Sequence, residues 1–101
     1  MNYFGDKIKE LRQGKNLLQK HVASKLNIDT PMLSKIERGE RKPKKDQIKV
    51  IAQVLSVKSD DLISLWLADK VCEVLKNEST ALKAIEVAQK EIRFSNKKYK
   101  V

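Results

Sequence analysis

Residues 19–39 read QKHVASKLNIDTPMLSKIERG, and the organisation of the whole chain follows from this stretch. Its first part predicts a short amphipathic helix over 17–26, which Asn16 can cap because Asn is among the preferred N-cap residues. The inward face of this helix is formed by Val22, Ala23 and Leu26. Asn27 then tolerates the left-handed backbone conformation that a sharp turn needs. A helix followed by a tight polar turn is therefore expected.

A second short helix follows the turn and ends at Gly39. Asp29 or Thr30 can cap it, and Pro31 falls in its first turn, where the missing N–H of proline does no harm. Its buried side is formed by Leu33 and Ile36. The positions left facing outward are Thr30, Pro31, Ser34, Lys35 and Arg38. This helix thus has one face for a core and one polar face for a partner.

Helical periodicity continues through the rest of the chain, and no segment alternates polar and apolar residues as a half-buried strand would. Each further segment places its apolar residues on one face of a helix. The expected helices span about 3–13, where Gly14 marks the end, then 45–55, 60–76 and, after a cap at Ser79, a last helix to Phe94. We therefore predict an all-α protein with five helices in its N-terminal part and a C-terminal helical extension.

The charge of the chain is strongly positive and is concentrated in its N-terminal half. The 101 residues carry a formal net charge of +9. Residues 1–58 hold 14 Lys and Arg against 6 Asp and Glu, a net charge of +8, whereas residues 59–92 hold 4 against 7, a net charge of −3. DNA attracts cationic proteins because binding releases its condensed counterions. A basic surface also suits simple solubility, but its location favours double-stranded DNA as the partner of the N-terminal half.

Several classes of function find no support in the sequence. With one cysteine, Cys72, and one histidine, His21, the chain has no disulfide pair and no cluster with metal-ligand spacing. No nucleophile and base are arranged as in an enzyme, and we expect no cofactor, metal or small-molecule ligand. The longest uncharged run, residues 50–57, is far shorter than the ~20 residues that span a bilayer, and the N-terminus lacks the apolar core of a signal peptide. A cytoplasmic protein without a membrane partner is expected.

The order of these elements resembles the helix-turn-helix domain of the Xre-type and lambdoid phage repressors, over roughly residues 4–65. The positions that carry the resemblance are Arg12, Gln19, Ala23, Leu26, Ser34, Ile36, Glu37, Gly39, Pro43, Ile51, Ala52, Leu55, Val57, Asp60, Asp61 and Leu62. Three positions depart from the family pattern: Leu18 replaces a capping Thr, Asn27 a turn Gly, and Lys44 a small polar cap. A lost cap costs typically ~1 kcal/mol. The resemblance implies a lambda-repressor-like DNA-binding fold.

The resemblance also implies that the second helix of residues 19–39 enters the major groove, while the first lies across the DNA backbone. Lys35 is the expected reader of guanine, because a long cation can reach O6 and N7, and Thr30 and Pro31 can contact a thymine methyl. The expected base contacts are Thr30, Pro31, Ser34 and Lys35. The expected phosphate contacts are Gln19, Arg38, Arg41, Lys42, Lys44 and Lys45. For the basic run RGERKPKK, a solvated loop is the alternative.

Four other polar residues are interpreted as structural or as background. In the resembled fold an Arg and a Glu at the positions of Arg12 and Glu37 pair within the domain, so Glu37 is not expected to touch DNA. If that pair is buried, removing one partner would cost about 3–5 kcal/mol. His21 is interpreted as a surface imidazole and Cys72 as a packed thiol.

The segment LISLWLADKVCEVL, residues 62–75, is too apolar to be covered by one domain surface. Part of it can pack against the last helix, whose Ala81, Ile85, Ala88 and Ile92 have 4-3-4 spacing. A monomeric bundle in which the last helix folds back is one alternative. We favour a homodimer, since two recognition helices about 34 Å apart can read both halves of a palindrome. The expected dimer interface consists of Leu65, Trp66, Cys72, Leu75, Ile85 and Ile92.

These features predict a homodimeric, sequence-specific transcription regulator that binds a palindromic operator and regulates its own gene. Among relatives of this size, the controller proteins of restriction-modification systems are the most similar. The expected organisation is a DNA-binding domain over 1–65, a dimerisation extension over 66–95 and a basic, disordered tail over 96–101. An antitoxin, or a phage or mobile-element repressor whose C-terminal helices bind a protein partner, is the alternative, as is a nonspecific nucleic-acid binder driven by charge.

Overall fold

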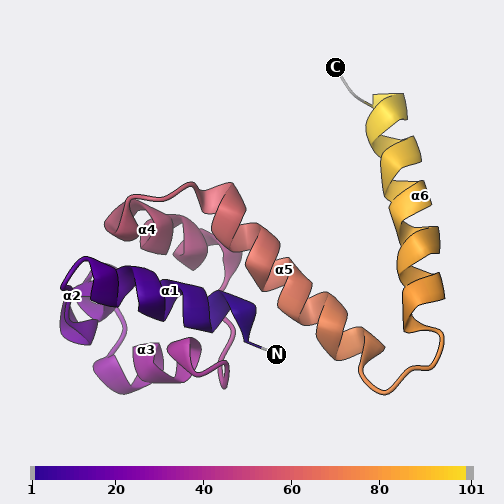
Figure 1. Cartoon of the computed structure of the whole chain (residues 1–101). Helices are drawn as coiled ribbons and strands as arrows, with labels where there is room; N and C mark the ends of the chain where they lie inside the picture. Colours follow the sequence, from indigo (N-terminus) through magenta and orange to yellow (C-terminus); the bar gives the residue numbers. More distant parts are fainter. Residues whose placement is uncertain (1, 100–101) are drawn as a thin grey trace.

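The computed structural model describes residues 2–99, with side chains through residue 96. Within this range the chain forms helices and no strand, so the predicted all-α class is confirmed. The helices are α1 (Tyr3–Gly14), α2 (Gln19–Lys25), α3 (Thr30–Glu37), α4 (Lys45–Leu55), α5 (Ser59–Leu75) and α6 (Ala81–Tyr99). Figure 1 shows α1–α4 gathered at one end, α5 leading away from them and α6 at the other end.

The first five helices share one apolar core. Its members are Phe4, Ile8, Val22, Ala23, Leu26, Leu33, Ile36, Ile48, Ile51, Ala52, Leu55, Leu62 and Trp66. α5 packs on α1 and α4, α3 packs on α1 and α2, and α4 packs on α1 and α2. Burial of a Leu or Ile side chain contributes roughly 1.5–3 kcal/mol. The apolar stripes expected from the sequence therefore supply the interactions that hold α3 in place.

Helices α1, α2, α3 and α4 end in the same way, with a left-handed residue that reverses the chain. The left-handed residues are Asn16 (φ 56°), Asn27 (φ 56°), Gly39 (φ 79°) and Ser56 (φ 57°). The next N–H then donates to a carbonyl five residues earlier, in the pairs Leu17–Arg12 (3.0 Å), Ile28–Ala23 (3.1 Å), Glu40–Lys35 (2.9 Å) and Val57–Ala52 (3.0 Å). Leu17, Ile28 and Val57 pack against the core. This arrangement explains how short polar turns connect closely packed helices.

The structure corrects the expected start of α2. Leu18, not Asn16, is the N-cap residue, and the left-handed Asn16 belongs to the turn that follows α1. Gly14 remains helical, so the chain reverses later than expected. The Leu18 N–H donates to Nδ1 of His21 at 3.3 Å, which supplies part of the missing cap. His21 is exposed, but it is not merely a surface imidazole.

The last helix also differs from expectation at both ends. Thr80, not Ser79, directly precedes α6, and the Thr80 carbonyl accepts a hydrogen bond from the Ala84 N–H at 2.9 Å. α6 continues past Phe94 to Tyr99, because this stretch contains neither Gly nor Pro to end a helix. Residues 96–99, expected to belong to a disordered tail, are helical here, and residues 100–101 lie outside the described part of the chain.

The structure shows which face of α5 meets the core, a point that the sequence left open. Its buried line is Leu62, Trp66 and Asp69, because this line faces α1 and α4. Trp66 was expected at a dimer interface but is 9% exposed and belongs to the core, and Leu65 packs partly against the same core. Cys72, expected to be a packed thiol, is exposed. Among the other expected interface residues, Leu75 and Ile85 line an open groove, and Ile92 is exposed.

α6 stands apart from the body of the protein, as Figure 1 shows, and it takes part in none of the main helix–helix packings. The radius of gyration is 15.8 Å, whereas a compact chain of this length has a value of about 13 Å. The molecule is therefore more open than a single closed bundle. Among residues 2–99, no helix combines the length and apolarity needed to cross a bilayer.

Candidate nucleic-acid interface

The candidate interface is centred on α3, whose two ends are defined by local hydrogen bonds. At its N-terminus the side chain of Asp29 accepts a hydrogen bond from the Met32 N–H at 2.8 Å. Pro31 lies in the first turn, where a helix needs no N–H donor. At its C-terminus Gly39 adopts φ 79°, a conformation that favours glycine. These features define where α3 begins and where it ends.

α3 has two distinct faces. Leu33, Ile36 and Glu37 are buried against the rest of the domain. Of the residues expected to contact bases, Thr30, Pro31 and Lys35 are exposed, and Ser34 is half-buried. All four therefore lie on the part of α3 that the core leaves uncovered. The ammonium of Lys35, the hydroxyl groups of Thr30 and Ser34 and the apolar ring of Pro31 are groups of the kind that contact base edges.

A buried network joins α3 to α1 and α2. Arg12 Nε donates to Glu37 Oε2 at 2.7 Å, and Arg12 Nη2 donates to Glu37 Oε1 at 3.1 Å. Arg12 Nη1 donates to the Leu17 carbonyl at 2.9 Å, which also ties the pair to the turn after α1. Because bidentate Arg–carboxylate geometry is highly directional, the pair fixes the rotation of α3 against α1. Glu37 is thus turned inward, away from the exposed face of α3.

Gln19, expected to contact phosphate, joins the same network. Its Nε2 donates to Glu37 Oε1 at 3.0 Å, and its side chain is half-buried. The Gln19 side-chain amide therefore already forms a hydrogen bond that connects α2 with α3. The Gln19 position still lies at the first residue of α2, next to the uncovered face of α3.

Arg38 is engaged with neighbours on the outer surface of α3. Its Nη1 donates to Ser34 Oγ at 2.5 Å, and its Nε pairs with the Glu40 carboxylate. The hydrogen bond from Arg38, together with its positive charge, lowers the pKa of Glu40, and the same contacts raise the pKa of Arg38. A carboxylate therefore neutralises part of the positive charge at the end of α3.

The remaining phosphate candidates lie between α3 and the start of α4. Arg41, Lys42, Lys44 and Lys45 are all exposed, whereas Pro43 between them is buried and anchors the loop. The Lys44 N–H donates to Gln47 Oε1 at 2.9 Å, so the start of α4 is capped from within the helix. The loop and the first residue of α4 therefore present four cations next to α3, and the backbone between them is anchored by Pro43.

Two residues that position this interface were missed by the sequence analysis. Asn2 caps α1 by accepting from the Gly5 N–H at 3.2 Å, and its Nδ2 donates to the Glu37 carbonyl at 2.8 Å. Asp69 of α5 accepts from the backbone N–H groups at the start of α1. Both residues could have been recognised in the sequence. Asn is a preferred N-cap residue, and Asp69 continues the 4-3 spacing of Leu62 and Trp66 on one face of the helix.

The chain is similar to known DNA-binding proteins over this region. Residues 8–62, more than half of the chain, match the family described as Helix-turn-helix. Over 61 residues, or 60% of this chain, the sequence is 38% identical to the HTH-type transcriptional activator BcrR of Enterococcus faecalis. The match covers 30% of BcrR, so the chain corresponds to a minor part of that relative. No solved structure matches the chain significantly. From the match over residues 8–62, the chain belongs to the Helix-turn-helix family.

Proposed function

We propose that this protein is a sequence-specific transcription regulator that reads the major groove of DNA with α3. The observation that carries the proposal is the division of α3 into two faces. Leu33 and Ile36 are fixed in the core, while Thr30, Pro31 and Lys35 remain exposed on the other side. Membership of the Helix-turn-helix family, and the similarity to a relative named as a transcriptional activator, support this role.

Lys35 is the proposed reader of guanine, because its ammonium can reach the O6 and N7 acceptors in the major groove. Thr30 and Pro31 contact a thymine methyl, and Ser34 contributes a hydroxyl near the same base pairs. Proline has no N–H, so Pro31 adds shape rather than a hydrogen bond to the readout. Specificity therefore depends mainly on Lys35.

Phosphate contacts supply most of the affinity and fix the position of α3 on the duplex. Arg41, Lys42, Lys44 and Lys45 are the proposed phosphate ligands on the loop, because they are exposed next to α3. Arg38 joins them once its pairing with Glu40 is exchanged for a phosphate. Gln19 acts mainly by holding Glu37, and it meets the DNA backbone from the first residue of α2.

The protein acts as a homodimer on a palindromic operator near its own gene, in the manner of the small restriction-modification controllers that its sequence resembles. Two copies of α3 about one helical turn apart read two half-sites. The exposed apolar residues of α5 and α6, such as Val71 and Val74, support pairing of two copies.

Footprinting on the DNA upstream of the gene tests this function. A symmetric protected site with half-sites one helical turn apart is expected. In the same assay Lys35→Ala should weaken binding to that site by about 1–3 kcal/mol while leaving binding to random DNA nearly unchanged. The matched control is Lys76→Ala, which removes an exposed lysine in the acidic part of the chain. Equal losses on specific and random DNA would indicate a charge-driven, nonspecific binder instead.

A further inference from the structure

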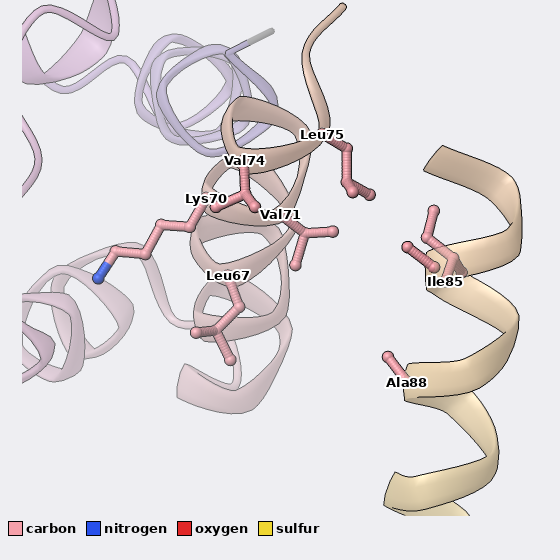
Figure 2. Close-up of a pocket in the computed structure, with 8 residues that line it drawn as sticks. Leu67, Lys70, Val71, Val74, Leu75, Ile85 and Ala88 are labelled. Atoms are coloured by element: carbon pink, nitrogen blue, oxygen red, sulfur yellow. The ribbon is translucent and has the colours of Figure 1, made fainter. Parts of the chain in front are cut away.

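An apolar groove separates the second half of α5 from α6, as Figure 2 shows. It has a volume of about 320 Å³. Its two walls are formed by Leu67, Val71 and Val74 on α5 and by Ala84, Ile85 and Ala88 on α6. Lys70 also lines the groove, but its side chain points away from α6 and its Nζ lies 3.5 Å from the centre of the Trp66 ring. The groove therefore presents mainly apolar surface.

Within one chain, the apolar side chains on the two walls of the groove remain exposed to solvent. Leu67, Val71, Val74, Ile85 and Ile92 each expose between 40% and 75% of their surface. Most helical stability in proteins comes from tertiary packing of an amphipathic face rather than from the intrinsic propensity of the helix. α6, with 19 residues and no main packing partner, therefore needs a surface that buries its apolar side.

We propose that α6 of a second copy of this chain fills the groove, and that the two copies exchange these helices about a two-fold axis. This inference rests on the homodimer proposed above and specifies how it forms. Ile85, Ala88 and Ile92 follow the 4-3 spacing of a helix that packs between other helices. The small Ala84 and Ala88 allow the backbones of neighbouring helices to approach closely. Each α6 then contacts both α5 and α6 of the other copy.

The net charge of this region disfavours nucleic acid as the occupant, and the size of the exposed apolar surface suits a second copy. Residues 59–92 carry a net charge of −3, which disfavours nucleic acid here. Covering the five exposed side chains in both copies, at roughly 100 Å² each, buries about 1,000 Å². That area is at the lower limit of about 1,000 Å² for a specific protein interface.

The proposed exchange is compatible with DNA binding. Figure 1 shows that α6 lies away from α3 and does not cover it. Thr30 and Lys35 therefore stay exposed when the groove is filled. Since α5 is attached to the domain through Trp66 and Asp69, the dimer formed by α5 and α6 would set the distance between the two copies of α3.

Disulfide cross-linking between differently tagged chains tests the exchange. Both chains carry Cys72→Ser to remove the exposed native thiol. One chain also carries Val71→Cys and the other Ala88→Cys, and the mixture is oxidised at micromolar concentration. A disulfide that joins the two tags is expected. Replacing Ala88→Cys by Lys90→Cys, which places the thiol on the opposite side of α6, should give no such product.

Sedimentation of the chain, and of Ile85→Lys, completes the test. The unmodified chain should be a dimer, and Ile85→Lys a monomer whose α1–α5 core still unfolds cooperatively. The exchange would be overturned if the unmodified chain were a monomer, or if it were a dimer without the α5–α6 cross-link between chains. It would also be overturned if a chain that carries both Val71→Cys and Ala88→Cys formed the disulfide only within itself. A cross-linked dimer without an operator footprint would instead overturn the proposed function and leave this inference intact.

Discussion

The carboxylate of Asp69 accepts a hydrogen bond from the backbone N–H of Phe4 at 3.0 Å. Its other oxygen accepts from the Tyr3 N–H at 2.9 Å. Asp69 belongs to α5 and is 8% exposed, whereas the two donors begin α1. N–H groups in a first helical turn have no intrahelical partner, and the positive end of the helix dipole favours an anion. The Asp69 side chain thus connects α5, which leads to α6, with α1, against which α3 packs.

Asp69→Asn should lower the free energy of unfolding by about 1–3 kcal/mol, because an amide leaves one of the two N–H groups without an acceptor. Urea denaturation followed by circular dichroism measures this change. Glu73→Gln on the exposed side of the same helix is the control and should shift stability by less than about 0.5 kcal/mol. Equal effects of the two variants would show that the cap contributes no stability.

Glu37→Gln should be more damaging, since it leaves the guanidinium of Arg12 buried without its counter-ion. The side chains of Arg12 and Glu37 are 11% and 3% exposed. Breaking a buried ion pair typically costs about 3–5 kcal/mol, whereas replacing both partners by apolar residues is often tolerated. The double variant Arg12→Met, Glu37→Leu should therefore be more stable than Glu37→Gln in a denaturation series. A double variant less stable than Glu37→Gln would contradict this reasoning.

Gly5→Ala and Gly14→Ala should change stability in opposite directions, although both lie in α1. Replacing an interior helical Gly by Ala usually stabilises a protein by roughly 0.5–1 kcal/mol. A Cβ at Gly14 meets no atom within 4 Å, whereas a Cβ at Gly5 would lie 2.5 Å from the Glu37 carbonyl oxygen. Gly14→Ala should therefore raise the thermal unfolding midpoint and Gly5→Ala should lower it. A stabilising Gly5→Ala would mean that α1 and α3 are less closely packed than the structure indicates.

Local patterns in the sequence were sufficient for the order of the helices and the faces of α3. Leu33 and Ile36 point inward and Lys35 outward because helical periodicity alone separates them. The sequence could not show which side of α5 meets the core, since its apolar residues surround most of the helix. Trp66 was therefore assigned to a dimer interface, although the packing of α5 on α1 and α4 buries it within the chain.

Interactions between distant segments were also beyond the sequence. Asn2 was recognisable as a helix cap, but its contact with the Glu37 carbonyl depends on how α1 and α3 approach each other. The contact of Gln19 with Glu37 likewise depends on how α2 and α3 pack. The partners of Arg38, Ser34 and Glu40, are local in the sequence, but Arg38 was assigned to phosphate without regard to them. α6 also continues into residues whose basic composition favoured a disordered tail, and no Gly or Pro there interrupts the helix.

Glu40→Gln should increase the affinity of the protein for any DNA sequence. Glu40 pairs with Arg38 at the end of α3, beside the proposed phosphate contacts. Arg38 lowers the pKa of Glu40, so the pair persists at neutral pH and is lost only as the pH falls through that lowered pKa. Replacing the carboxylate by an amide frees Arg38 and removes a charge that repels phosphate. Binding should therefore tighten several-fold at low salt on specific and random DNA alike.

The salt dependence of binding separates this mechanism from a change in base readout. Each additional phosphate contact steepens the slope of log affinity against log salt concentration by about 1. Glu40→Gln should show this steeper slope in a fluorescence anisotropy titration, because Arg38 becomes one more phosphate ligand. Glu10→Gln is the matched control, since Glu10 also pairs with a cation on the surface, Lys7 of α1 at 3.9 Å. If both variants change the slope equally, net charge alone accounts for the effect, and the pairing of Arg38 with Glu40 does not restrain DNA binding.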